Sequence, residues 1–273
     1  MAAQMGADLA AIRSLLFVPA DDQRKLARVA TRGADAVIVD LEDAVAEGGK
    51  VAARQTAAMA LAAMPERTLR MLRVNAGGTA FHDEDLAMLD GLVLDAVVLP
   101  KAVPQALGGV AASGLPVLAI VESAAGLRAA YEIATHPAVF ALMLGAADLS
   151  ADLGLTPRED GLEILYARSR LVLDSRVAGI RPPFDGVHLK LEDPDGLLAQ
   201  ARLARTLGMR GKACIHPAQV ALVHAAFAPD DAEVAWARRV LEAAGAGGVR
   251  AVDGMMVDEA ILARARGILS EAG

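Results

Sequence analysis

The stretch that most clearly decides the fold is residues 117–123, VLAIVES, where five apolar residues run directly into a carboxylate and a hydroxyl. A strand that is apolar throughout, without alternation, is typical of a parallel sheet covered on both faces. Eight such runs recur, and helical spacing of apolar residues follows each of them. The runs are Leu15–Val18, Ala36–Leu41, Leu69–Val74, Ala96–Leu99, Val117–Val121, Ala141–Leu144, Gly186–Leu189 and Gly211–Ile215. This alternation predicts an α/β fold, a (β/α)8 TIM barrel, with an open doubly wound sheet as the alternative.

The domain organisation follows from the length of 273 residues, which suits one barrel of about 250 residues. Residues 1–228 are predicted to form the barrel, a catalytic domain. Residues 229–273 lie beyond the eight strand–helix repeats and are predicted to form a C-terminal helical extension at a subunit interface.

Composition argues against several classes of protein. The formal charge is −7 and aromatic residues make up 3% of the chain, so a basic, aromatic nucleic-acid surface is not expected. No uncharged apolar run approaches the roughly 20 residues of a membrane span, and Met1–Ala11 lacks the features of a secretory signal. These features predict no membrane partner. The single cysteine, Cys214, allows no intrachain disulfide, which favours a cytoplasmic protein.

Polar residues crowd the carboxyl ends of five apolar runs, which is where barrel enzymes place their active sites. A single charge at such a position is more often a solvated loop residue or a helix cap, but five in register are hard to explain in that way. The polar segments are Asp40–Asp43, Arg73–Asn75, Pro100–Lys101, Glu122–Ser123 and Gly145–Asp148.

The strongest pair is Glu122 and Asp148, because both carboxylates follow fully apolar runs and would repel each other without a cation. Mg2+ suits two protein carboxylates and keeps positions for water and substrate oxygens, and Mn2+ could replace it. Zinc is disfavoured because no His/Cys cluster has ligand spacing. The alternative is structural: Glu122 pairs with Arg73 or Lys101, and Asp148 caps a helix.

Arg73 and His216 are the other reactive candidates at strand ends. The Arg73 guanidinium could fork onto a carboxylate or a developing enolate oxygen, or could pair with Glu42 or Asp43. His216 could act as a base or could equally be a packing residue.

With these residues in view, the sequence resembles the citrate lyase beta subunit-like family of the aldolase/citrate lyase superfamily. The resemblance runs from Arg13 to the C-terminus and rests on an ordered series of motifs. They are Arg13–Pro19, Asp40–Val45 followed by Lys50 and Arg54, Arg73–Asn75, Leu99–Lys101, Val121–Ser123, Gly145–Leu149, Lys212–Pro217 and Met256–Asp258.

The resemblance implies a homotrimer that binds Mg2+ through Glu122 and Asp148 and contacts substrate through Arg73. It also implies that Asp258 is catalytic and reaches the site of a neighbouring subunit, although this residue could simply cap the last helix. The substrates it implies are an acyl-CoA and a 2-oxo acid, joined as a 3-hydroxyacyl-CoA thioester of the citryl-CoA, malyl-CoA or citramalyl-CoA type. Further substrate contacts are expected from Glu42, Asp43, Asn75 and Lys101, and contacts to CoA from Arg13 and Lys25. One departure is Ala147, where many relatives carry Glu.

The predicted reaction is therefore a reversible retro-Claisen cleavage by a carbon–carbon lyase. Two alternatives stay open. The first is a class II metal-dependent aldolase that acts on free 2-oxo-3-deoxy acids without CoA. The second is a non-catalytic or carrier-dependent subunit of a larger lyase complex.

Overall fold

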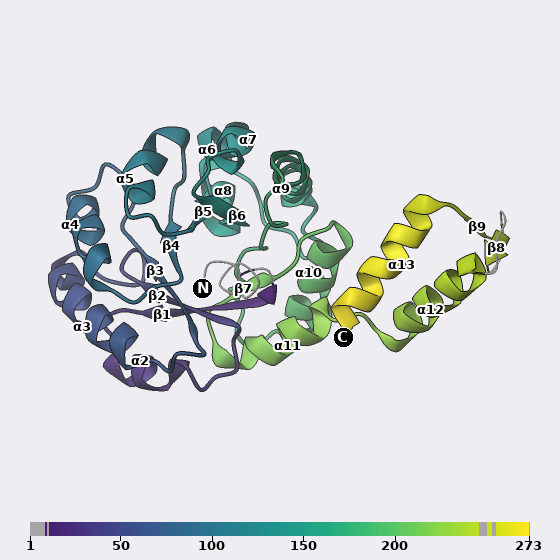
Figure 1. The fold of residues 1–273 in the computed structure, drawn as a ribbon. Helices are drawn as coiled ribbons and strands as arrows, with labels where there is room; N and C mark the ends of the chain where they lie inside the picture. The colour runs from purple at the N-terminus through teal and green to yellow at the C-terminus, as the bar shows by residue number, and fades with distance from the viewer. Residues whose placement is uncertain (1–8, 10, 246–249, 253–254, 273) are drawn as a thin grey trace. The chain divides into compact units, whose positions relative to one another are not determined.

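Seven parallel strands form one curled sheet in the order β6-β5-β4-β3-β2-β1-β7 in the computed structural model (Figure 1). The structure describes residues 9, 11–245, 250–252 and 255–272. By contacts the chain divides into two compact units, Met1–His224 and Ala225–Gly273. The strands of the first unit are β1 Ser14–Pro19, β2 Ala36–Asp40, β3 Leu69–Arg73, β4 Ala96–Leu99, β5 Val117–Val121, β6 Val139–Leu144 and β7 Lys212–Cys214.

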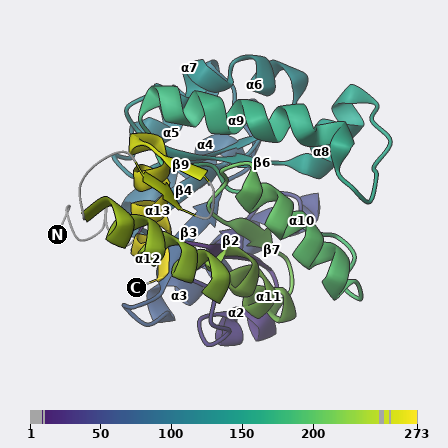
Figure 2. The same ribbon diagram turned by 90° about the vertical axis from the view of Figure 1, so that its right-hand side faces the viewer.

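Helices surround this sheet (Figure 1), as expected when strands and helices alternate along the chain. They are α2 Gln23–Val29, α3 Lys50–Ala63, α4 His82–Ala87, α5 Leu107–Ala111, α6 Ala124–Arg128, α7 Ala130–Ala134, α8 Ala146–Leu153, α9 Leu165–Ala178, α10 Pro194–Thr206 and α11 Pro217–Phe227, with short 3-10 turns at Glu47–Gly49, Leu89–Gly91, Pro104–Ala106 and Leu162–Ile164. Figure 2 shows α9, α10 and α11 following one another beside β6 and β7. Within the described residues no helix is long and apolar enough to cross a membrane.

The inner face of the sheet carries a packed apolar core. Side chains two residues apart on a strand share a face, so Leu118 and Ile120 of β5 point inward together, as do Ala141 and Met143 of β6. Burying such side chains stabilises the fold by about 1.5–3 kcal/mol each. Glu122 is two residues after Ile120, so its side chain points to the same inner face, just beyond the end of β5.

The predicted strand Gly186–Leu189 is wrong. The residues that pair between β6 and β7 are Phe184, which bridges Met143, and Asp185, which bridges Lys212. Two prolines, 182 and 183, precede this pair, and because proline has no N–H to donate they shorten the ladder. The sheet is therefore a curled seven-stranded one, in which two bridging residues stand just before the position of the seventh predicted strand and β7 corresponds to the eighth.

The second unit consists of α12 Asp231–Gly245, an antiparallel hairpin of β8 Arg250–Val252 and β9 Met255–Val257, and α13 Glu259–Ala272. The two helices pack through a small core whose buried members are Ala237, Val240, Ala265 and Ile268. Arg264 lies over the Trp236 ring, 4.9 Å from its centroid.

Candidate active site

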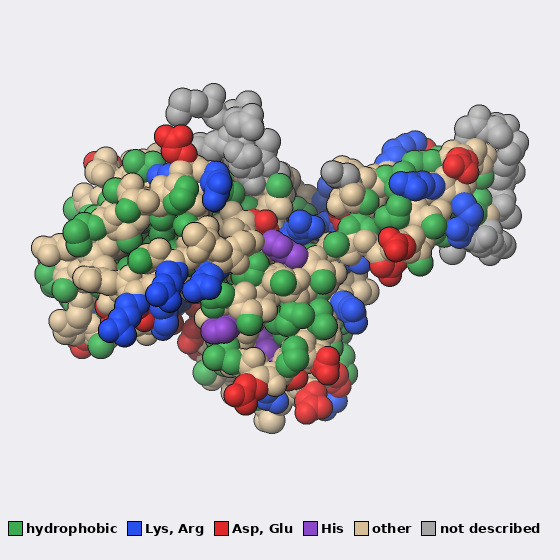
Figure 3. Space-filling view, turned by 90° about the horizontal axis from the view of Figure 1, so that it is seen from below, with side chains coloured by type: hydrophobic (Ala, Val, Ile, Leu, Met, Phe, Trp, Pro, Cys, Tyr) green, Lys and Arg blue, Asp and Glu red, His purple; other side chains and the backbone are tan. Residues whose placement is uncertain are grey.

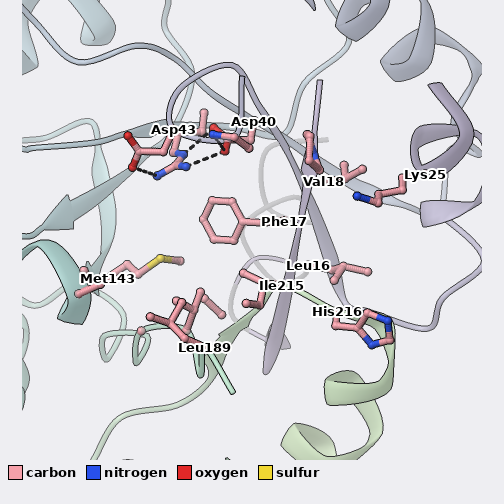
Figure 4. Close-up of a pocket in the computed structure, with 18 of the residues that line it drawn as sticks. Leu16, Phe17, Val18, Lys25, Asp40, Asp43, Met143, Leu189, Ile215 and His216 are labelled. Carbon is pink, nitrogen blue, oxygen red and sulfur yellow. Dashed lines mark hydrogen bonds and ion pairs between the residues drawn. The ribbon is translucent and has the colours of Figure 1, made fainter. Parts of the chain in front are cut away.

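A cavity of about 850 Å3 opens at the carboxyl ends of the strands (Figure 4). This volume is within the usual range for a small-molecule site. The lining residues used below are Phe17, Arg24, Lys25, Arg28, Arg32, Asp40, Asp43, Arg73, Ile120, Glu122, Met143, Gly145, Ala147, Asp148, Val187, Leu189, Ile215 and His216.

Glu122 lies directly after β5 and is only 4% exposed. Its Oε1 accepts a hydrogen bond from the backbone N–H of Lys101 at 2.7 Å. Burial raises the pKa of Glu122 to about 8; the Lys101 N–H opposes the rise, and the charges of Glu42 and Asp148 add to it. A cation placed beside this carboxylate would offset the cost of its burial and the repulsion from Glu42 and Asp148.

Gly145 makes room for Glu122. A Cβ at position 145 would lie 2.4 Å from both Cβ and Oε2 of Glu122, far inside van der Waals contact. The turn between β6 and α8 therefore needs glycine because the Glu122 side chain packs against it.

Asp148 lies in the first turn of α8, exposed and lining the same cavity as Glu122. Strands β5 and β6 pair in parallel with Val121 opposite Leu144, so the segments that follow them emerge side by side. Among the described residues no group of three or more His, Cys, Asp or Glu side chains is placed to hold a metal ion. Glu122 and Asp148 would thus supply two oxygen ligands, an arrangement that Mg2+ uses together with water and substrate oxygens.

Arg73 is held by a carboxylate that the sequence did not single out. Asp40 and Arg73 are register partners on β2 and β3. Asp40 accepts from Nε at 2.7 Å and from Nη2 at 2.6 Å, while Glu42 pairs with Nη1 at 2.9 Å. The guanidinium also stacks 5.0 Å from the centroid of the Phe17 ring. Burial alone would lower the pKa of Arg73, but Asp40 and the neighbouring carboxylates outweigh it and raise the pKa, so this group stays a fixed cation.

Lys101 and Glu42 complete the charged network beside Glu122. The ammonium of Lys101 is hydrogen-bonded to Oε1 of Glu42 and lies 3.8 Å from Asp43. Lys101 has φ 48°, the one positive value found at a non-glycine position in the described chain. Glu42 is 5% exposed and contacts both Arg73 and Lys101, so it positions the two cations relative to each other.

Asn75 lies outside the cavity, in a separate hydrogen-bond network. Its side-chain N–H donates to Asp85 at 2.6 Å, and its Oδ1 accepts from Nζ of Lys50 at 2.6 Å. Arg54 binds the other oxygen of Asp85. Asn75 is buried in this network and does not line the cavity. Its contacts therefore hold the loop after β3 in place, and it does not contact a ligand in the cavity.

A row of four cations, three on α2 and Arg32 just beyond its end, lines the cavity, and the sequence prediction named only Lys25 among them. Arg24, Lys25, Arg28 and Arg32 are all exposed, and Lys25 pairs with Asp22 at 3.2 Å. Figure 3 shows Lys and Arg side chains gathered on the face seen from below, where α2 lies in Figure 1. Their spacing along residues 24–32 is a signal that sequence reasoning could have used.

Arg13 does not join this row. It precedes β1, at the amino-terminal edge of the sheet, whereas the cavity lies at the carboxyl edge. Its backbone N–H donates to Asp35 at 2.8 Å. Arg13 therefore takes no part in the site proposed below.

His216 and Asp258 complete the list of predicted residues. His216 lines the cavity, and its Nδ1 accepts from the N–H of Ala218 at 3.2 Å. In the second unit Asp258 caps α13, where its side chain accepts from the N–H of Ile261 at 2.9 Å. That cap is the structural role considered for Asp258 from the sequence.

The chain is similar to several proteins of one family. The model of the HpcH/HpaI aldolase/citrate lyase family matches residues 13–217. The citrate lyase subunit beta-like protein of Deinococcus radiodurans is 40% identical over 284 residues, covering 97% of this chain and 99% of that protein. The (3S)-malyl-CoA thioesterase of Cereibacter sphaeroides is 36% identical over 269 residues, covering 95% and 94%. A crystal structure of CitE from Mycobacterium tuberculosis in complex with magnesium, acetoacetate and coenzyme A is similar, with a TM-score of 0.86 at 40% identity, covering 97% of this chain and 99% of that one.

Proposed function

This chain belongs to the HpcH/HpaI aldolase/citrate lyase family, and we propose that it is a magnesium-dependent lyase that cleaves or forms a 3-hydroxyacyl-CoA thioester. The family predicted from the sequence, a lyase family of the citrate lyase beta-subunit type, is confirmed. The observation that carries the proposal is a buried carboxylate, Glu122, that shares one cavity with Asp148 and with a row of cations.

The donor set fits Mg2+. Glu122 and Asp148 offer hard carboxylate oxygens, and the raised pKa of Glu122 marks a place where a negative charge lacks compensation. Bound by these two residues, the ion would stabilise negative charge on substrate oxygens as a Lewis acid.

The chain's own groups would then orient the substrate. Asp40 and Glu42 hold the Arg73 guanidinium in one orientation. Its remaining N–H groups therefore point in fixed directions and can bind one carboxylate. Lys101 adds a second charge, positioned by Glu42. Asp258 would move the proton at C2 of the acyl group as general acid and base, as part of a site shared between subunits.

CoA recognition is proposed for α2. Phosphate groups need cations, and Arg24, Lys25, Arg28 and Arg32 present four of them along one wall of the cavity. Arg24 and Arg28 are one helical turn apart on α2, so both can face the same ligand.

We also propose that the sheet closes into a full (β/α)8 barrel and that the protein is a homotrimer. The bridges of Phe184 and Asp185 to the two edge strands support closure. The small core of the Ala225–Gly273 unit supports assembly, because a unit of this size whose core has four buried members among its described residues rarely folds without another surface.

The experiment for the CoA part measures the melting temperature of the purified chain with CoA or acetyl-CoA. A rise is expected in the wild type. It should shrink in Arg28→Gln but not in Arg176→Gln, an exposed arginine of α9 that does not line the cavity. No rise with either ligand would favour the aldolase that acts on free oxo acids.

A further inference from the structure

We propose that a buried ion cluster of Arg168, Asp185 and Lys212 positions the magnesium site from outside the cavity. By fixing the turn between β6 and α8, the cluster sets the Mg2+ affinity of Glu122 and Asp148, in addition to holding the sheet together. The inference rests on the proposed function, since it takes these two carboxylates as the ligands. The three members of the cluster do not line the cavity, so they act through the backbone and touch no ligand.

The cluster is closed to water. Asp185 is 0% exposed, Lys212 1% and Arg168 2%. Oδ1 of Asp185 accepts from Nε of Arg168 at 2.9 Å, and Oδ2 accepts from Nζ of Lys212 at 2.6 Å. Burial alone would raise the pKa of Asp185, but the two cations outweigh it and lower the pKa, so the carboxylate stays ionised.

Net stability is a poor explanation for such a cluster. Taking three charges out of water costs about as much as their attraction returns, and apolar side chains of similar volume often stabilise a protein equally well. Removing one member is costly, however, because it leaves an uncompensated charge in the interior. The three side chains therefore hold the segments that carry them in one arrangement.

Those segments meet at the seam, which is formed by Phe184 and Asp185 between the edge strands β6 and β7. Phe184 bridges Met143 of β6, and Asp185 bridges Lys212 of β7. Phe184 belongs to the inner core, so the side chain of Asp185 points to the opposite face of the sheet, where Arg168 of α9 meets it. The backbone ladder here is two residues long, and the ionic contacts add the constraint that a longer strand would supply.

Gly186 transmits the position of the seam to the turn between β6 and α8. A Cβ at position 186 would lie 2.6 Å from the carbonyl oxygen of Leu144 and 3.2 Å from the backbone nitrogen of Ala146. The backbone of residue 186 is therefore in direct contact with the residues on both sides of Gly145. Since Gly186 follows Asp185 directly, a displacement of that carboxylate displaces this contact as well.

Gly145 connects the turn to both metal ligands. A Cβ there would overlap the Glu122 side chain and would also lie 3.1 Å from Cγ2 of Ile120, so the turn cannot move towards β5. Asp148 follows in the first turn of α8. A shift of the turn therefore moves Asp148 relative to Glu122. Mg2+ requires ligand oxygens at about 2.0–2.1 Å in nearly octahedral geometry, so such a shift lowers its affinity.

The test measures the Mg2+ Kd by calorimetry in Asp185→Asn and in a matched control, Asp174→Asn. Asp174 is also a buried aspartate, but it pairs at 2.6 Å with Arg170 of the same helix, α9. Both substitutions remove the carboxylate charge from a buried ion pair, so both should lower Tm. The Kd is expected to rise about tenfold or more in Asp185→Asn, as it does when groups that orient metal ligands are lost, and to stay at the wild-type value in Asp174→Asn.

Lys212→Met is the second variant, and it decides the question if Asp185→Asn does not fold. It leaves Arg168 and Asp185 as a balanced ion pair and replaces the buried ammonium with an apolar side chain, a change that folds usually tolerate. It also cuts the ionic link from Asp185 to β7. The Mg2+ Kd should therefore rise while Tm stays close to the wild-type value, which a purely stabilising role of the cluster would not produce.

The outcomes separate the inference from the proposed function. Wild-type Mg2+ affinity in folded Asp185→Asn or in Lys212→Met would overturn the inference, and so would an equal loss of affinity in Asp174→Asn. Each of these results leaves the proposed lyase standing. A wild-type protein that binds no Mg2+ would instead overturn the proposed function, and the inference with it.

Discussion

At the scale of single residues, Arg73 shows why charge alone does not define a role. Its planar fork meets Asp40 in two parallel hydrogen bonds and reaches Glu42 with the third nitrogen. Lysine keeps the charge but cannot make these contacts at once. We expect Arg73→Lys to lower kcat by roughly 10²-fold or more, as loss of one preorganised donor does, while circular dichroism stays unchanged. Near-wild-type kinetics would make Arg73 a structural residue only.

Glu122 predicts a pH dependence of metal binding. Its pKa of about 8 in the folded protein lies above its ordinary value of 4.5. The folded state therefore binds more protons between these values, and without metal its stability should fall as pH rises from about 4.5 to about 8. A metal ion needs the ionised form, so Mg2+ affinity should rise over the upper part of the same window and level off above it.

Calorimetry in buffers of different ionisation enthalpy checks this expectation. Binding at pH 7 should release a proton in the wild type, and Glu122→Gln should remove that release. An affinity for Mg2+ that is flat between pH 6 and pH 9 would contradict the assignment of Glu122 as a ligand.

At the scale of elements, the turn between β6 and α8 is expected to tolerate no side chain at position 145. A Cβ there would overlap Glu122, so Gly145→Ala should cost about 1–3 kcal/mol of unfolding free energy, typical of overpacking, and weaken Mg2+ binding. Gly108→Ala is the matched control, because no atom lies within 4 Å of its added Cβ and the residue is exposed in α5. Equal stability of the two variants would show that the loop adapts.

The elements also show which parts of the fold the sequence predicts. Apolar runs locate seven strands to within two residues at each end, and Ala96–Leu99 and Val117–Val121 match their strands at both ends. The run at Gly186–Leu189 misled because hydrophobicity alone does not tell a strand from an apolar cavity wall: Val187 and Leu189 line the cavity instead of pairing. The two prolines just before Phe184 were the signal for a shortened pairing.

The sequence likewise predicts some parts of the site and not others. Strand ends in register brought Glu122, Asp148 and Arg73 to one cavity, as the barrel pattern predicts. Asp40 was missed as the partner of Arg73, because the register between two strands cannot be read from one sequence. Asn75 was placed at a strand end correctly, but its partners Lys50 and Asp85 come from distant segments that no local pattern reveals.

At the scale of the whole molecule, Asp258 tests whether subunits share a site. Asp258→Ala and Glu122→Ala proteins should each be inactive, and mixing them under conditions of subunit exchange should restore part of the activity. The physical reason is that some mixed assemblies then combine an intact metal pair with an intact aspartate. Exchange is verified by mass spectrometry of the mixed assemblies. If exchange occurs and activity does not return, Asp258 is a helix cap or acts within its own chain.

The central claim is that this chain alone breaks a carbon–carbon bond with Mg2+ held by Glu122 and Asp148. The most direct measurement incubates the purified chain with malyl-CoA, citramalyl-CoA or citryl-CoA and quantifies all products by mass spectrometry. We predict that one of these thioesters yields acyl-CoA and 2-oxo acid in equal amounts, that a chelator stops the reaction, and that Glu122→Gln does not support it. Release of free CoA with an intact hydroxy acid would instead indicate thioester hydrolysis, and carbon–carbon cleavage that persists in Glu122→Gln would contradict the claim.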